Sequence, residues 1–238
     1  MCTVTFLPFK DKLLITSNRD ELKLRAPASS PETHEFPNGK ILFPKDGQAG
    51  GTWIAAHENG NAMVLLNGAF TRHIHNPPYR KSRGLIFLEI FDSDDPKKAF
   101  EQIELGDIEP FTLVIWQQGV LWETKWDGKE KYIIPRKADA PQIWSSAMLY
   151  DPEVRELRRK WFYEWLATHE QPSADDIRQF HEFGGEGDER TALRMNRDGI
   201  LLTVSITGME ITKSKNTMYY KDMVTGASSV NEFIFARD

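Results

Sequence analysis

The chain has 238 residues, of which 40% are hydrophobic and 27% are charged. These fractions are typical of globular proteins, and they exclude the low-hydrophobicity composition that keeps chains disordered. The formal charge of -5 at pH 7 offers no basic surface for phosphate groups, so nucleic acid is not an expected partner. We expect one domain that covers residues 1–238.

The start of the chain, MCTVTFLPFK, lacks the basic and apolar segments of a signal peptide. No stretch approaches the roughly 20 apolar residues that span a bilayer, so we expect a cytoplasmic protein without a transmembrane segment. A single cysteine cannot form an internal disulfide and is too little for a structural zinc site. The sequence therefore predicts no metal site and no required cofactor.

The first third of the chain is predicted to be mainly β structure. Runs of β-branched, aromatic and aliphatic residues predict strands at residues 3–6, 13–16, 41–43, 52–56 and 62–66. Prolines and glycines interrupt residues 21–51, which we interpret as a long surface segment around one short strand. The Asn59-Gly60 pair tolerates the backbone conformation of a tight turn and predicts a hairpin.

The rest of the chain combines helices and strands. Helical spacing and start signals predict helices at residues 83–91, 96–105, 151–168 and from 173 onward. Strand patterns follow at residues 111–116, 120–126, 142–145, 193–195, 200–206 and 232–235, with a turn at 196–199. Strand clusters at both ends with helices between them predict an α+β domain, with helices that cover a largely antiparallel sheet or pair of sheets.

The only cysteine is the second residue of the chain. The initiating methionine is commonly removed when the second residue is small, so Cys2 would carry both a thiol and a free α-amine. An α-amine has a pKa of about 7.7–8.0 and can act as a base toward that thiol. The alternative is a small buried residue in an edge strand, since free cysteine is among the most buried residue types.

The second predicted strand ends in the charged run Ser17-Asn18-Arg19-Asp20-Glu21. A hairpin brings this end beside residues 2–4. Arg19 would then favour the thiolate of Cys2, and Asp20 would accept a hydrogen bond from its α-ammonium group. The alternative is an exposed, ion-paired turn.

Several motifs occur in a shared order along most of the chain: MCTVTF at the start, SNRDE at 17–21, GGTW at 50–53, LLNG at 65–68 and WSSAMLYDPEVRELRRKWF at 144–162. With these motifs the sequence resembles the NRDE family, which includes the transport and Golgi organisation proteins of eukaryotes. That family in turn resembles the cysteine N-terminal-nucleophile hydrolases, such as penicillin V acylase and bile salt hydrolase. The resemblance implies an N-terminal-nucleophile hydrolase-like αββα layered sandwich with mostly antiparallel sheets.

The same resemblance implies site residues. Catalytic roles fall on Cys2, Arg19, Asp20 and Asn67. Asn67 would donate to an oxyanion, where the loss of one donor typically costs about 10²–10³ in rate. Asn67 also fits an ordinary strand-terminating turn before Gly68. Substrate contacts fall on Asn18, Trp53 and Ser146.

Two positions depart from the hydrolase pattern. The second oxyanion asparagine is replaced by Ser145 or Ser146, whose hydroxyl can donate but with a different reach. The late catalytic arginine is missing from residues 203–207, and Arg190 and Arg194 replace it only by proximity in sequence.

Two functions of different classes follow. The first is a cysteine amidohydrolase that acts on linear, non-peptide amide or acyl bonds of a small molecule through an acyl-enzyme. The second is a non-catalytic carrier, because members of the resembled family are implicated in haem trafficking. His73 and His75 would then be axial ligands of haem as cargo, with Arg72 at a propionate, although this basic loop also fits an exposed segment.

A lipid or acyl-coenzyme A carrier is a third hypothesis, which no residue of the sequence selects.

Overall fold

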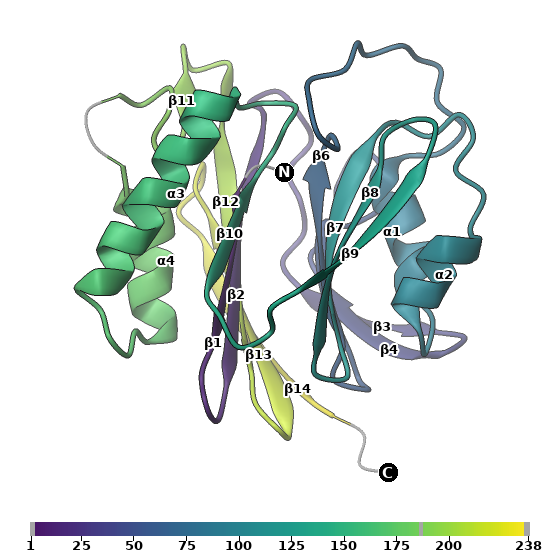
Figure 1. Cartoon of the computed structure of the whole chain (residues 1–238), viewed down its shortest axis with the longest axis horizontal. Coiled ribbons are helices and arrows are strands. Elements are labelled where there is room, and N and C mark those ends of the chain that lie inside the picture. The colour runs from purple at the N-terminus through teal and green to yellow at the C-terminus, as the bar shows by residue number, and fades with distance from the viewer. Residues whose placement is uncertain (1–2, 186–187, 236–238) are drawn as a thin grey trace.

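The computed structural model describes residues 3–185 and 188–235, which form two antiparallel sheets (Figure 1). The first sheet has the order β10-β1-β2-β12-β13-β14, with β11 paired to β12. Its strands are β1 (Thr3–Pro8), β2 (Leu13–Leu22), β10 (Gln142–Ser145), β11 (Asn196–Arg197), β12 (Leu201–Ile211), β13 (Lys215–Asp222) and β14 (Ser228–Ile234).

The second sheet follows the chain, with the order β3-β4-β5-β6-β7-β8-β9. Its strands are β3 (Glu32–Phe36), β4 (Gly39–Phe43), β5 (Ile54–His57), β6 (Ala62–Asn67), β7 (Phe111–Gln117), β8 (Val120–Trp126) and β9 (Lys131–Arg136). The tight turn predicted at Asn59-Gly60 is confirmed, and Gly60 adopts the positive φ of 86° that such a turn needs. Gly119, in the turn between β7 and β8, has a φ of 83°.

The hairpin of β1 and β2 is buried on both faces. Val4, Phe6 and Ile15 belong to a core cluster that also contains Val64 and other residues of the second sheet. On the opposite face, a second cluster joins this hairpin to the helices through Leu7, Leu14, Phe162 and Phe180. The predicted first hairpin is thus confirmed, and it runs through the middle of the molecule.

Four helices cover the outer faces of the sheets within the described residues (Figure 1). α3 (Pro152–Ala167) and α4 (Ala174–Phe183) lie outside the first sheet, and α1 (Arg83–Phe91) and α2 (Pro96–Gln102) lie outside the second. Side chains of Ser82, Asp95 and Ser173 cap three of them at the predicted starts. The result is the predicted αββα layered sandwich.

Some sequence expectations on secondary structure were wrong. β3, β9 and β13 were not predicted, and the last strand begins at Ser228 instead of Glu232. β3 and β9 form the two edges of the second sheet, where charged residues and Pro135 are tolerated and mask the strand pattern. Residues 21–51 are more than a surface segment, because they contain two strands and the buried Asp46.

No helix in the described ranges is both long and apolar enough to cross a membrane.

Candidate functional site

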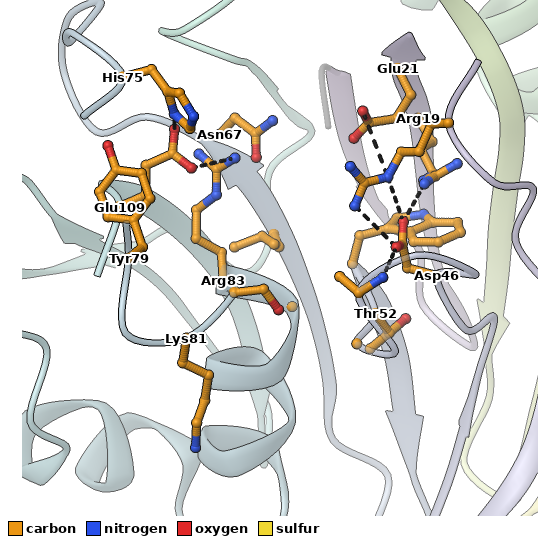
Figure 2. A pocket seen from close by; sticks show the side chains of 17 residues that line it. Arg19, Glu21, Asp46, Thr52, Asn67, His75, Tyr79, Lys81, Arg83 and Glu109 are labelled. Carbon is orange, nitrogen blue, oxygen red and sulfur yellow. Dashed lines mark hydrogen bonds and ion pairs between the residues drawn. The ribbon is translucent and has the colours of Figure 1, made fainter. Parts of the chain in front are cut away.

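A cavity of about 400 Å³ opens where the ends of β2 and β6 meet two loops of the second sheet (Figure 2). One wall carries Arg19 and Asp46, and the other carries Arg83 and Glu109. Both walls hold ion pairs, so the cavity presents charged donors and acceptors to any ligand. Asn67, at the end of β6, also lines it.

Arg19 reaches from β2 of the first sheet to a loop that follows β4. Its guanidinium group forms an ion pair with Asp46 and lies 4.7 Å from the ring centroid of Trp53. Arg19 is only 3% exposed, so the alternative of an exposed turn is wrong for this residue. Trp53 lines the cavity, and its contact with a substrate stays a prediction.

Asp46 is fixed by several donors. Nε and Nη2 of Arg25 each lie 3.0 Å from one of its oxygens, and the backbone amide of Ala49 donates at 2.7 Å. Burial alone would raise the pKa of Asp46, but hydrogen bonds from Arg25 and Ala49 and the charge of Arg19 outweigh it, so the pKa is lowered. The carboxylate is therefore charged at neutral pH and holds Arg19 in place.

Asp20 lies next to Arg19 in β2 but is held by other elements. It is 2% exposed, and the hydroxyls of Tyr150 and Thr203 donate to its two oxygens at 2.6 and 2.5 Å. β12 has an irregular register between Thr203 and Ser205, where it pairs with Asp20 and Arg19. The segment expected to lack the late arginine thus contributes a hydroxyl to Asp20.

Cys2 lies outside the described residues. Thr3, the first described residue, pairs with Asn18 of β2 and with Ser145 of β10. β1 therefore begins beside the end of β2 that carries Arg19 and Asp20, as the hairpin predicted.

Asn67 and Ser146 connect the two sheets. The Ser146 hydroxyl donates to the backbone carbonyl of Asn67 at 2.8 Å and accepts from the Met148 amide at 3.2 Å. Gly68, with a φ of 81°, lets the chain pass Met148 closely after β6 ends. Asn67 thus lines the cavity and also ends a strand. The hydroxyl of Ser146 serves the backbone, which does not fit the predicted substrate contact.

Asn18 points away from the cavity. Its amide nitrogen donates to the carbonyls of His181 and Leu193 at 3.1 and 2.7 Å, and its Oδ1 lies 2.5 Å from Nδ1 of His181. Side chains alternate along a strand, so Asn18 faces α4 while Arg19 faces the second sheet. The expected substrate contact of Asn18 does not fit this position, and the residue joins β2 to the helix layer.

The opposite wall centres on Glu109. Nε2 of His73 and Nδ1 of His75 each lie 3.2 Å from its Oε1, and Arg83 forms an ion pair with Oε2 at 3.0 Å. Burial alone would raise the pKa of Glu109, but the Arg83 charge and the histidine hydrogen bonds lower it. The loop between β6 and α1 is thus tied to the wall of the cavity.

The haem-binding residues expected from the sequence lie in this loop. His75 lines the cavity, whereas the neighbouring Arg72 is exposed. Each histidine would have to give up its contact with Glu109 if that same nitrogen were to bind iron. Haem binding by this loop stays a prediction.

Sequence reasoning missed Asp46, Glu109, Arg83 and Tyr150. Each carboxylate is isolated in the sequence and reaches its partners only through the fold, so no local pattern marks it. Tyr150 lies inside the segment 144–162 that carries the family resemblance, which was the only signal for it.

A family model, Transport and Golgi organisation 2, matches residues 1–180. The chain belongs to this family. The finding confirms the membership expected from the NRDE motifs. A comparison of this Transport and Golgi organisation 2 family protein with curated protein sequences found no match.

Solved structures share the fold of this Transport and Golgi organisation 2 family protein. A mutant of the conjugated bile acid hydrolase from Clostridium perfringens has a TM-score of 0.62 at 12% identity, covering 100% of this chain and 97% of that chain. An N-acylethanolamine-hydrolyzing acid amidase ortholog from Caenorhabditis elegans has a TM-score of 0.62 at 11% identity, covering 87% and 92%. These likenesses confirm the N-terminal-nucleophile hydrolase-like fold.

Proposed function

We propose that the protein is a cysteine hydrolase that cleaves a linear, non-peptide amide or acyl bond of a small molecule, with Cys2 as nucleophile. One observation carries the proposal: β1 begins beside the buried Arg19 and Asp20, at the edge of a cavity of about 400 Å³. Cys2 is joined to Thr3 by one peptide bond, which separates consecutive Cα atoms by about 3.8 Å.

The proposed reaction uses the chain's own groups. The thiolate of Cys2 attacks the carbonyl carbon of an amide, and the side-chain amide of Asn67 donates to the oxyanion. The C–N bond then breaks, and the α-ammonium group gives its proton to the leaving amine. Water, deprotonated by the α-amine, hydrolyses the resulting thioester and restores the thiol. Arg19 favours the thiolate, and Asp20 orients the α-ammonium group.

The fold supports this proposal by analogy. The similar solved structures bear the names of a hydrolase of conjugated bile acid and of an acid amidase that hydrolyses N-acylethanolamine. At identities of 11–12%, these structures share the fold with this chain. Its reaction and its substrate are therefore part of the proposal.

Mass spectrometry tests the proposal in two steps. Intact mass and N-terminal sequencing are expected to give a mature chain that starts at Cys2. Incubation with a panel of N-acyl amides, varied in acyl chain and amine, is expected to give an acyl adduct on the only cysteine and then free acid.

The Cys2→Ala variant is the matched control. It should show the circular dichroism and melting temperature of the wild type but neither adduct nor turnover. Equal turnover by Cys2→Ala would overturn the mechanism, and so would turnover by a chain that retains Met1.

A further inference from the structure

Arg158 of α3 is a cation with no access to solvent, at 0% exposure. Its Nε donates to the Thr191 carbonyl at 3.0 Å, and its Nη2 donates to the Ala192 carbonyl. Its Nη1 donates to the hydroxyl of Thr3, the first described residue of β1. Arg158 therefore holds the start of β1 from the helix side of the first sheet.

The charge of Arg158 has an unusual environment. Among the residues that the structure describes, no carboxylate forms an ion pair with it, although a buried charge is costly without one. Instead, its Cζ lies 3.6 Å from the ring centroid of Tyr150. The hydroxyl of the same Tyr150 donates to Asp20 at 2.6 Å. Tyr150 thus links the buried cation to the carboxylate at the end of β2.

This link has a chemical consequence. A cation above an aromatic face is attracted by the π electrons and withdraws them. The phenol then donates more strongly, and a hydrogen bond to a carboxylate at 2.6 Å is already in the short, charge-assisted range. Arg158 therefore reinforces the contact that orients Asp20.

We propose that Arg158 is a positioning residue of the active site: it fixes β1 through Thr3 and orients Asp20 through Tyr150. The inference rests on the proposed function, because it gives the contacts of Arg158 a role in the proposed reaction of Cys2. Arg158 lies on the helix side of the sheet and takes no part in bond making. It acts through Thr3 and Asp20.

The single cysteine gives a test that needs no substrate. The rate at which iodoacetamide alkylates Cys2, followed by intact mass from pH 5 to 9, reports the ionisation of this thiol, since the thiolate is the reacting form. Arg158→Met removes the charge but keeps a long side chain. It is expected to raise the midpoint of the rate profile by about half a pH unit or more.

The route through Tyr150 is tested by a double variant. Tyr150→Phe should move the midpoint in the same direction, and Arg158→Met combined with Tyr150→Phe should move it no further than the larger single effect. Arg159→Met is the matched control. Arg159 follows Arg158 in α3, but it is exposed and pairs only with Glu156 among the described residues, so its substitution should leave the profile unchanged.

A folded Arg158→Met protein with the wild-type midpoint would overturn the inference, and so would an equal shift in Arg159→Met. If Arg158→Met does not fold, an unchanged midpoint in Tyr150→Phe overturns it. Failure of the proposed hydrolase function has a different result. The wild-type chain that starts at Cys2 would form no acyl adduct, while Arg158→Met would still shift the midpoint of the alkylation profile.

Discussion

Asp46 lies on a loop of the second sheet and forms a buried ion pair with Arg19 of the first sheet. The pair of Arg19 and Asp46 closes one wall of the cavity (Figure 2). Arg25 also forms an ion pair with Asp46 and completes the cluster. Packing between sheets and formation of the cavity are therefore coupled through one carboxylate.

Asp46→Asn should destabilise the protein. The amide keeps the shape and can still accept from the loop backbone, but it removes the carboxylate that pairs with Arg19 among the described residues. We expect the free energy of unfolding in urea to fall by about 2–4 kcal/mol, since loss of one partner from a buried pair is costly. Glu156→Gln, which removes an exposed pair with Arg159, should cause no measurable loss. A wild-type stability for Asp46→Asn would contradict this expectation.

His181 should make the fold sensitive to mild acid. Burial, and then the charge of Arg158, lower its pKa from 6.5 to about 3. The unfolded chain therefore binds a proton that the folded chain does not, so stability present above pH 6.5 is lost as the pH falls from 6.5 toward 3. In His181→Gln, the melting temperature should fall less between pH 7 and pH 5 than in the wild type.

His169→Gln, at the C-terminal end of α3, is the matched control for that measurement. It should keep the wild-type slope of melting temperature against pH. An identical slope in His181→Gln and wild type would show that another group causes the acid sensitivity.

Ser146→Ala should weaken the contact between the sheets at the site. It removes the donor to the Asn67 carbonyl, which is only partly buried, so we expect a loss of about 1 kcal/mol, at the lower end of the cost of an unsatisfied acceptor. Urea unfolding measures this loss. Ser145→Ala, one residue earlier in β10, should change stability by no more than about 0.5 kcal/mol. Equal effects of the two substitutions would count against the role of this hydrogen bond.

Glu109→Ala should release the loop between β6 and α1. The substitution removes the acceptor shared by His73 and His75 and the partner of Arg83. Charge-assisted hydrogen bonds of this kind stabilise the closed loop, and their loss should raise the population of the open loop by about ten-fold or more. Limited trypsin digestion with mass analysis should show faster cleavage after Arg72.

Glu101→Ala removes an exposed carboxylate that pairs with Lys97 in α2, and it should leave the rate of loop cleavage unchanged. No difference between the Glu109→Ala variant and wild type would show that the loop is held by other contacts.

Local signals explain which parts of the fold were predictable. The Asn59-Gly60 turn and the capping residues Ser82 and Ser173 act over a few positions, so the hairpin and the helix starts follow from the sequence. Edge strands such as β3 contain charged residues, so their sequences look like those of loops. Their pairing is decided by the neighbouring strand, which no short window contains.

The same contrast holds for the site. Arg19, Asp20 and Asn67 belong to motifs and could be predicted as a group. Side chains alternate along a strand, so Asn18 and Arg19 must face opposite sides of β2. This rule alone predicts that the two residues cannot both face the cavity. The role of Asp46 could not be predicted, because it depends on an ion pair with Arg19, which lies 27 positions away in the other sheet.

The strand order has a consequence for synthesis on the ribosome. Each strand of the second sheet pairs with the next along the chain, so this sheet can assemble as residues 32–136 emerge. β2 must wait for β12, which supplies Thr203 to Asp20 only after residue 200 has been translated. The charged end of β2 is thus made before the second sheet but completed after it, and a nascent chain has no finished site until β12 has been made.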